Sequence, residues 1–183
     1  MEKLRHSQDK QTATDAATME FFSDANNQEQ KTYIVLGGHR CGTSFMGRSL
    51  HKAGIKISGD PGRFEDIEFV KLNERILADN NVDWRNPPSS EIVCNRQDEI
   101  EALMKKKRAS GGQFWGWKDP RQALTIDHYL PYLEGDTYLI CIFRKPEKSA
   151  ESLANMGQSR NGVNMSLEYN RRIIEAVKRF IGL

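Results

Sequence analysis

Short apolar runs alternate with amphipathic stretches along most of this chain. The runs typical of buried strands are 32–36 (TYIVL), 114–118 (FWGWK) and 137–143 (TYLICIF). Apolar residues at helical spacing predict helices at 43–53, 64–78, 91–108, 126–133, 147–156 and 167–180. Strands that alternate with helices predict an α/β fold, a three-layer sandwich around a central, mainly parallel sheet. The run at 137–143 is continuous and apolar, which is typical of a central parallel strand.

Residues 1–31 are polar and lack a sustained apolar stripe, so they predict a partly mobile N-terminal segment. The organised α/β domain is expected to span 32–183, because 183 residues suffice for one core and hardly for two. Polar loops are expected at 82–90 and 157–164.

Charge and cysteine content narrow the classes of partner. With 27 basic and 25 acidic residues, the net charge of +2 gives no reason to expect a nucleic-acid partner. Three widely spaced cysteines without a CxxC pair argue against a disulfide framework or a zinc site, and no other metal site is indicated. No apolar run approaches the ~20 residues that cross a bilayer, and no signal peptide is visible, so a cytoplasmic protein without a membrane partner is expected. The oligomeric state is left open by the sequence.

A glycine-rich segment, 37–44 (GGHRCGTS), lies between the first predicted strand and the helix after it. Glycines permit a tight turn that directs backbone N–H groups into one concavity, and the helix N-terminus adds partial positive charge. Thr43 and Ser44 add hydroxyl donors. The spacing resembles GxxxxGK[ST], but position 43 is threonine and the nearest cation is Arg40. The segment therefore predicts an anion site, and the missing lysine opposes an ATP-type site.

Two motifs together resemble those of the PAPS-dependent sulfotransferases, over roughly residues 32–180. GGHRCGTSFM resembles the 5′-phosphosulfate loop of that family, and the Arg144-to-Ser152 stretch is similar to its 3′-phosphate motif. Arg144 leaves the end of a predicted strand and can fork onto a phosphate, with Ser152 on the next helix bonding another oxygen. The cofactor-binding residues that the resemblance implies are Gly38, His39, Arg40, Cys41, Gly42, Thr43, Ser44, Phe45, Arg144 and Ser152. Phe45 would stack on adenine, although a core position is equally open to it.

The resemblance implies a P-loop-like sulfotransferase fold, with PAPS (3′-phosphoadenosine 5′-phosphosulfate) as co-substrate and PAP as product. The sulfuryl group would pass by in-line displacement to a hydroxyl or amine of a small-molecule or carbohydrate acceptor. The alternatives are a P-loop small-molecule kinase and a non-catalytic relative that binds PAP or PAPS.

The expected catalytic groups are two cations and a carboxylate. By the resemblance, Arg40 contacts the bridging oxygen and Lys118 is a second cation at a strand end, although an ion pair with Asp119 would equally explain Lys118. Glu65 is preferred over Asp119 as the base that removes the acceptor's proton. Arg121 is expected to help with the cofactor or an anionic acceptor. Trp84, Trp115 and Trp117 are open to either an acceptor pocket or the core.

Overall fold

The computed structural model describes residues 29–157 and 161–182. The segment predicted to be polar and mobile lies outside these residues up to position 28, and the first strand begins at Lys31, one residue before the expected domain start. The strands are β1 (Lys31–Gly37), β2 (Lys56–Ile57), β3 (Phe114–Lys118) and β4 (Asp136–Ile142). The helices are α2 (Thr43–Lys52), α3 (Ile67–Asp79), α4 (Gln97–Gly111), α5 (Gln122–Thr125), α6 (Pro146–Ala154) and α7 (Gly162–Phe180).

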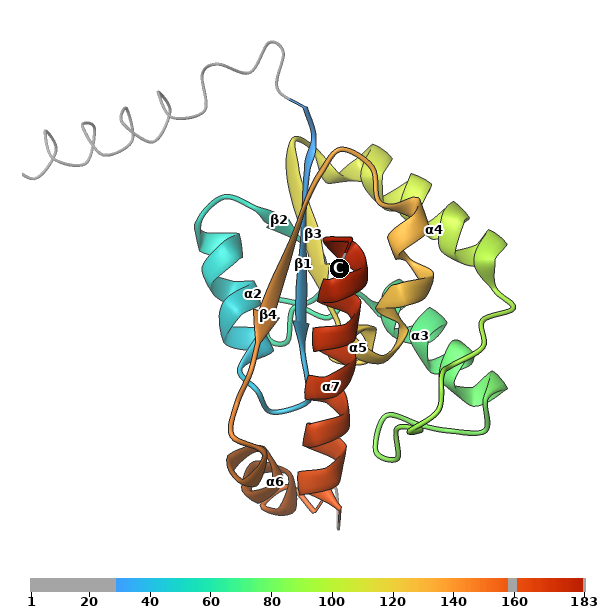
Figure 1. Ribbon diagram of the computed structural model, residues 1–183. Helices are drawn as coiled ribbons and strands as arrows, with labels where there is room; N and C mark the ends of the chain where they lie inside the picture. The colour runs from blue at the N-terminus through green and yellow to red at the C-terminus, as the bar shows by residue number, and fades with distance from the viewer. Residues whose placement is uncertain (1–28, 158–160, 183) are drawn as a thin grey trace, which may run out of the picture.

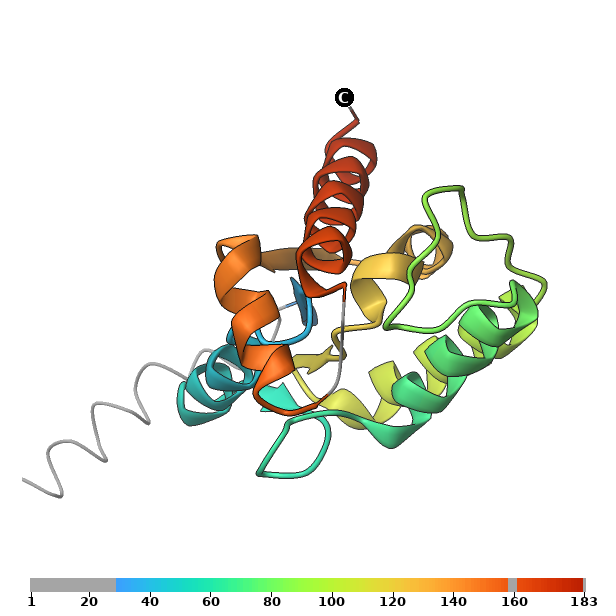
Figure 2. The same ribbon diagram turned by 90° about the horizontal axis from the view of Figure 1, so that it is seen from below.

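The four described strands form one all-parallel sheet in the order β2-β3-β1-β4, with helices on both faces. α2 packs against β1, β2 and β3 on one face, while α4, α5 and α7 pack on the other (Figures 1 and 2). An α/β fold with a parallel sheet is therefore confirmed. None of the described helices is both long and apolar enough to cross a lipid bilayer.

The hydrophobic core lies between β1, β3 and the helices α3, α4 and α7. Ile34 and Leu36 of β1 pack there with Trp115 and Trp117 of β3, and all four are buried. Trp117 stacks on Phe69 of α3 with ring centroids 4.4 Å apart. Trp115 and Trp117 therefore belong to the core, not to an acceptor pocket.

Three local predictions need correction. The segment 126–133, expected to be a helix, instead forms two 3₁₀ turns directly after α5, Ile126–His128 and Leu130–Tyr132, and Pro131 lacks the N–H for a regular helix. The loop expected at 157–164 ends earlier, because α7 already begins at Gly162. The short strand β2 was not predicted, since two residues carry no periodicity.

The position of β4 is the largest correction, because the strand expected at the centre of the sheet lies at its edge. β1 and β3 occupy the centre. The residues of β4 are exposed or half-buried throughout, whereas five of the seven residues of β1 are buried, namely Thr32 and those from Ile34 to Gly37. A continuous apolar run indicates burial, but it does not say how many strands flank it.

A buried polar network ties the end of β3 to α3 and α5. The Asn73 amide nitrogen donates to Asp119 (2.9 Å) and Gln122 (3.1 Å), and its oxygen accepts from the hydroxyls of Thr125 (2.7 Å) and Tyr129 (2.9 Å). All five residues are buried. Because every polar atom of the Asn73 side chain has a partner, the network holds α3 at a fixed position beside β3.

Replacing Asn73 with leucine keeps the branched shape and removes the hydrogen bonds of four buried polar groups to Asn73, of which Asp119 and Gln122 keep a second partner. We expect Asn73→Leu to lower the free energy of unfolding by about 3 kcal/mol, measured by urea denaturation. Asn95→Leu, at an exposed position, is the matched control and should change it by less than about 0.5 kcal/mol. Equal midpoints for the two variants would contradict the role given to the network.

Candidate functional site

A cavity of about 500 Å³ opens at the carboxyl ends of the parallel strands. The register places Val35 of β1 beside Lys118 of β3, and Gly37 beside Ile142 of β4, so all three strands end at the same edge. This edge is where ligands bind in open α/β sheets. The lining residues are His39, Arg40, Gly42, Thr43, Ser44, Arg63, Glu65, Trp84, Pro120, Arg121, Arg144 and Met156.

The loop between β1 and α2 forms one wall of this cavity. Its turn needs positive φ angles at Arg40 (65°) and Gly42 (97°), and the latter is the residue just before α2. Gly37 is closely packed, because a Cβ there would lie 2.6 Å from Cγ2 of Thr43. No side chain caps the N-terminus of α2, and Thr43 and Ser44 of its first turn line the cavity. The helix N-terminus is thus open toward the cavity, as an anion site requires.

The two halves of the predicted nucleotide motif meet beside this loop. Nε of Arg40 donates to Oγ of Ser152 on α6 at 2.9 Å, and Nη1 of Arg144 donates to the Arg40 carbonyl at 2.8 Å. Cys41 lies within 3.6 Å of the Ser149 hydroxyl, on the buried side of the same contact. Residues more than 100 positions apart therefore form one cluster. Arg40 and Arg144 line the cavity. Ser152 does not line it and is connected to it only by the hydrogen bond with Arg40.

Besides Ser152, three more of the expected cofactor-binding residues do not line the cavity. Gly38 is packed under Tyr169 of α7, where a Cβ would lie 3.2 Å from the Tyr169 Cβ, and Cys41 is buried. Phe45 is 75% exposed on α2, so it does not occupy a core position, which the sequence had left open.

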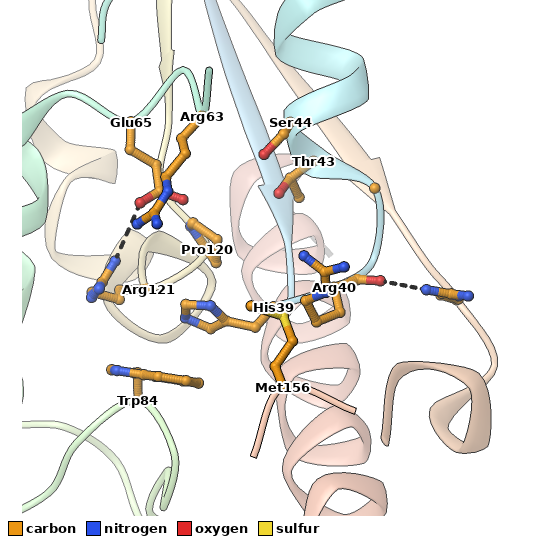
Figure 3. A pocket seen from close by; sticks show the side chains of 12 residues that line it. His39, Arg40, Thr43, Ser44, Arg63, Glu65, Trp84, Pro120, Arg121 and Met156 are labelled. Carbon is orange, nitrogen blue, oxygen red and sulfur yellow. Dashed lines mark hydrogen bonds and ion pairs between the residues drawn. The ribbon is translucent and has the colours of Figure 1, made fainter. Parts of the chain in front are cut away.

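A buried ion pair lies at the end of β3. The ammonium of Lys118 is fully buried and contacts Oε1 of Glu65 at 2.8 Å, with the Ser44 hydroxyl at 3.4 Å. Burial lowers the pKa of Lys118, and the charge of Glu65 acts in the opposite direction. Oε2 of Glu65 lies 4.0 Å from Arg121 (Figure 3). Glu65 therefore lies between Arg121, which lines the cavity, and Lys118, which is buried behind the cavity wall and does not line it.

Asp119 has a different partner from the one considered for it. Its carboxylate contacts Arg121 at 2.9 Å and Asn73 at 2.9 Å, so the alternative Lys118–Asp119 ion pair is not the arrangement found. Asp119 is fully buried and is not among the residues that line the cavity. Burial raises the pKa of Asp119, while Arg121 and Asn73 favour its ionised form. Its contacts are those of a residue that positions Arg121.

His39 belongs to the β1–α2 loop, and its ring points across the cavity to Trp84 (Figure 3). Its ring packs on Trp84 with centroids 4.0 Å apart and meets the edge of Tyr169 at 5.9 Å. Nε2 is buried without a hydrogen-bond partner among the described residues. Burial and the nearby charges of Arg121 and Lys118 lower the pKa of His39 to about 3. At neutral pH His39 thus offers a neutral ring to a ligand, not a positive charge.

Arg63, Pro120 and Met156 line the cavity but were not predicted. Arg63 projects from the loop between β2 and α3 toward Glu65 and Arg121 (Figure 3). A lone arginine in a Gly- and Pro-containing loop, two residues before Glu65, is the sequence signal that could have identified it. Among the described residues, no group of three or more His, Cys, Asp or Glu side chains is arranged to hold a metal ion.

The altered pKa of His39 predicts an acid-dependent loss of stability. Above pH 6.5 the ring is neutral in both the folded and the unfolded chain, so its contribution is complete. As the pH falls from 6.5 toward 3, only the unfolded chain takes up the proton. The free energy of unfolding should then fall by about 1.4 kcal/mol per pH unit through this group alone.

Urea denaturation at pH 7, 6 and 5 measures this effect. His39→Gln should remove that part of the slope, so its stability relative to the unaltered chain should rise as the pH falls. His51→Gln, at an exposed position outside the cavity, is the control and should keep the original slope. Parallel stability curves for His39→Gln and the unaltered chain would contradict the buried, neutral state of His39.

A scan against protein-family models, a search among curated proteins and a search among solved structures each found no match.

Proposed function

We propose that this chain transfers a sulfuryl group from PAPS to a hydroxyl or amine acceptor. The observation that carries the proposal is the contact of Arg40 with Ser152 (2.9 Å), together with that of Arg144 with the Arg40 carbonyl (2.8 Å). A nucleotide with a second phosphate on its 3′ side needs two anion sites at a fixed separation. The loop supplies one of these sites, and the Arg144–Ser152 pair supplies the other.

Each phosphate of PAPS has suitable donors in this arrangement. The 5′-phosphosulfate fits the open N-terminus of α2, with the hydroxyls of Thr43 and Ser44 and the guanidinium of Arg40 around it. The 3′-phosphate fits Arg144 and Ser152, and it would replace the bond that Ser152 now makes with Arg40. Phe45 has an exposed ring on the same helix and is available to the adenine.

The chemistry requires charge stabilisation and a proton acceptor. The acceptor oxygen or nitrogen attacks sulfur, the bond between sulfur and the bridging oxygen breaks, and its electron pair stays on the 5′-phosphate of PAP. Arg40 lines the cavity and stabilises that charge, and the buried Lys118 adds to it from behind Ser44, whose hydroxyl lies 3.4 Å from the ammonium. Glu65 takes the acceptor's proton, a role that its place in the cavity wall favours over Asp119. The acceptor would lie near Glu65, Arg63 and Trp84, which line the side of the cavity opposite the β1–α2 loop (Figure 3).

Isothermal titration calorimetry with adenosine 3′,5′-bisphosphate tests the binding step. We expect micromolar or tighter binding, weakened about tenfold to 100-fold by Arg144→Ala because one charge-assisted phosphate contact is lost. Arg48→Ala removes an exposed arginine of α2 that does not line the cavity, and it should bind like the unaltered chain. Tighter binding of Mg-ATP than of the bisphosphate would overturn the proposal in favour of a kinase-type site.

Glu65→Gln tests the proton transfer separately from binding. We expect PAP release from PAPS, with phenol, glucosamine or water as acceptor, to fall about 100-fold while bisphosphate affinity stays within about threefold. Glu74→Gln alters the exposed carboxylate on the other side of Arg121, and it should retain activity. Undiminished turnover by Glu65→Gln would remove Glu65 as the base, and binding without any turnover would favour a non-catalytic PAP-binding protein.

A further inference from the structure

β4 presents an unpaired edge. Within residues 29–157 and 161–182, no strand pairs with its outer side. β4 contains no proline and no charged residue after Asp136, so it lacks the usual features that keep edge strands from pairing. Tyr138 is 43% exposed and Phe143, just after the strand, is 50% exposed. An edge of this length and polarity is a template for another strand.

α7 also carries exposed apolar side chains that do not contribute to the hydrophobic core. Val163, Leu167, Ile174 and Ile181 are 38% to 58% exposed and follow one another at intervals of four, seven and seven residues. That spacing forms a stripe along one side of a helix and is typical of a seam between paired helices. The core side of α7 uses other residues, such as Tyr169 and Ile173, which are fully buried.

The C-terminal part of α7 lies beside the start of β4, because Arg179 and Phe180 line one cavity with Asp136 and Thr137. Arg172 donates to the carbonyls of Pro88 and Ser90, which anchors one flank of α7 to the loop before α4. Ile174 lies two residues further, about 200° around the helix from Arg172, and about 60° from Arg171, which donates to Ser89 of the same loop. Figure 1 shows that loop and α3 on one side of α7 and β4 on the other. Exposed apolar side chains of α7 and β4 therefore lie on two neighbouring elements.

We propose that this surface binds a second copy of the same chain, with the two β4 edges antiparallel and the two α7 stripes in contact. The charges beside β4 favour a reversed copy. The acidic residues Glu134 and Asp136 lie at its start, and the basic residues Arg144 and Lys145 follow its end, all of them exposed. An antiparallel pairing places the acidic end of each strand opposite the basic end of the other. A two-fold axis also closes the assembly, so no edge remains open at the interface.

Analytical ultracentrifugation of the full chain tests this proposal. At concentrations up to about 100 μM we expect a species with twice the 20.9 kDa mass of the chain. Leu167→Glu/Ile174→Glu places charges in the seam and should weaken association by about tenfold or more. Ile67→Glu/Val93→Glu makes the same charge change at exposed apolar positions on other elements, and it should leave association unchanged.

Hydrogen exchange on the unaltered chain tests the strand pairing without a mutation. Exchange of the β4 amides should slow as the concentration rises through the dissociation constant, while that of the β1 amides should not change. A chain that stays monomeric at about 100 μM overturns the proposal, and β4 amides protected at every dilution would instead assign the edge to residues 1–28. A dimer unaffected by the α7 double variant, or one whose β4 exchange does not respond to concentration, overturns it as well.

Discussion

The contact between Lys118 and Glu65 constrains the arrangement of the whole cavity. A fully buried ammonium is costly unless an opposite charge lies beside it, and Glu65 supplies that charge at 2.8 Å. Lys118 is the last residue of β3, whereas Glu65 closes the loop that leads into α3. The pair therefore fixes the position of this loop relative to the carboxyl end of β3. Because Ser44 also lies 3.4 Å from the ammonium, the first turn of α2 is tied to the same point.

Behind this pair, a second layer of polar contacts restricts what the site can do. Asp119 is buried between Arg121 and Asn73, and it orients the guanidinium that faces Glu65. Asn73 in turn depends on α5, since Thr125 donates to it. A change at Asn73 would therefore reach the cavity through Asp119 and Arg121 without touching a ligand. Such chains of bonds hold side chains in place only while every member keeps its partner.

Much of the local structure could be predicted from the sequence, because it depends on neighbouring residues. Strand, glycine turn and helix around Arg40 follow from periodicity, and parallel strands with a common carboxyl edge bring Arg144 near that loop. The partners of Lys118 and Asp119 could not be predicted in this way. Adjacent charges along the chain suggested a pair, but successive residues of an extended segment point to opposite sides, so each finds a partner on another element. The edge position of β4 also depends on which strands are neighbours, and no local pattern records this.

The edge position of β4 has a consequence for the proposed nucleotide site. Arg144 follows directly from this strand, which is held by β1 on one side and by no described strand on the other. The contact of Arg144 with the Arg40 carbonyl is exposed, so packing around it contributes little to its position. Pairing of β4 with a second copy would restrict the strand that carries Arg144 and would lower the entropy cost of holding the guanidinium against a phosphate. The proposed interface and the proposed 3′-phosphate site are thus coupled through one strand.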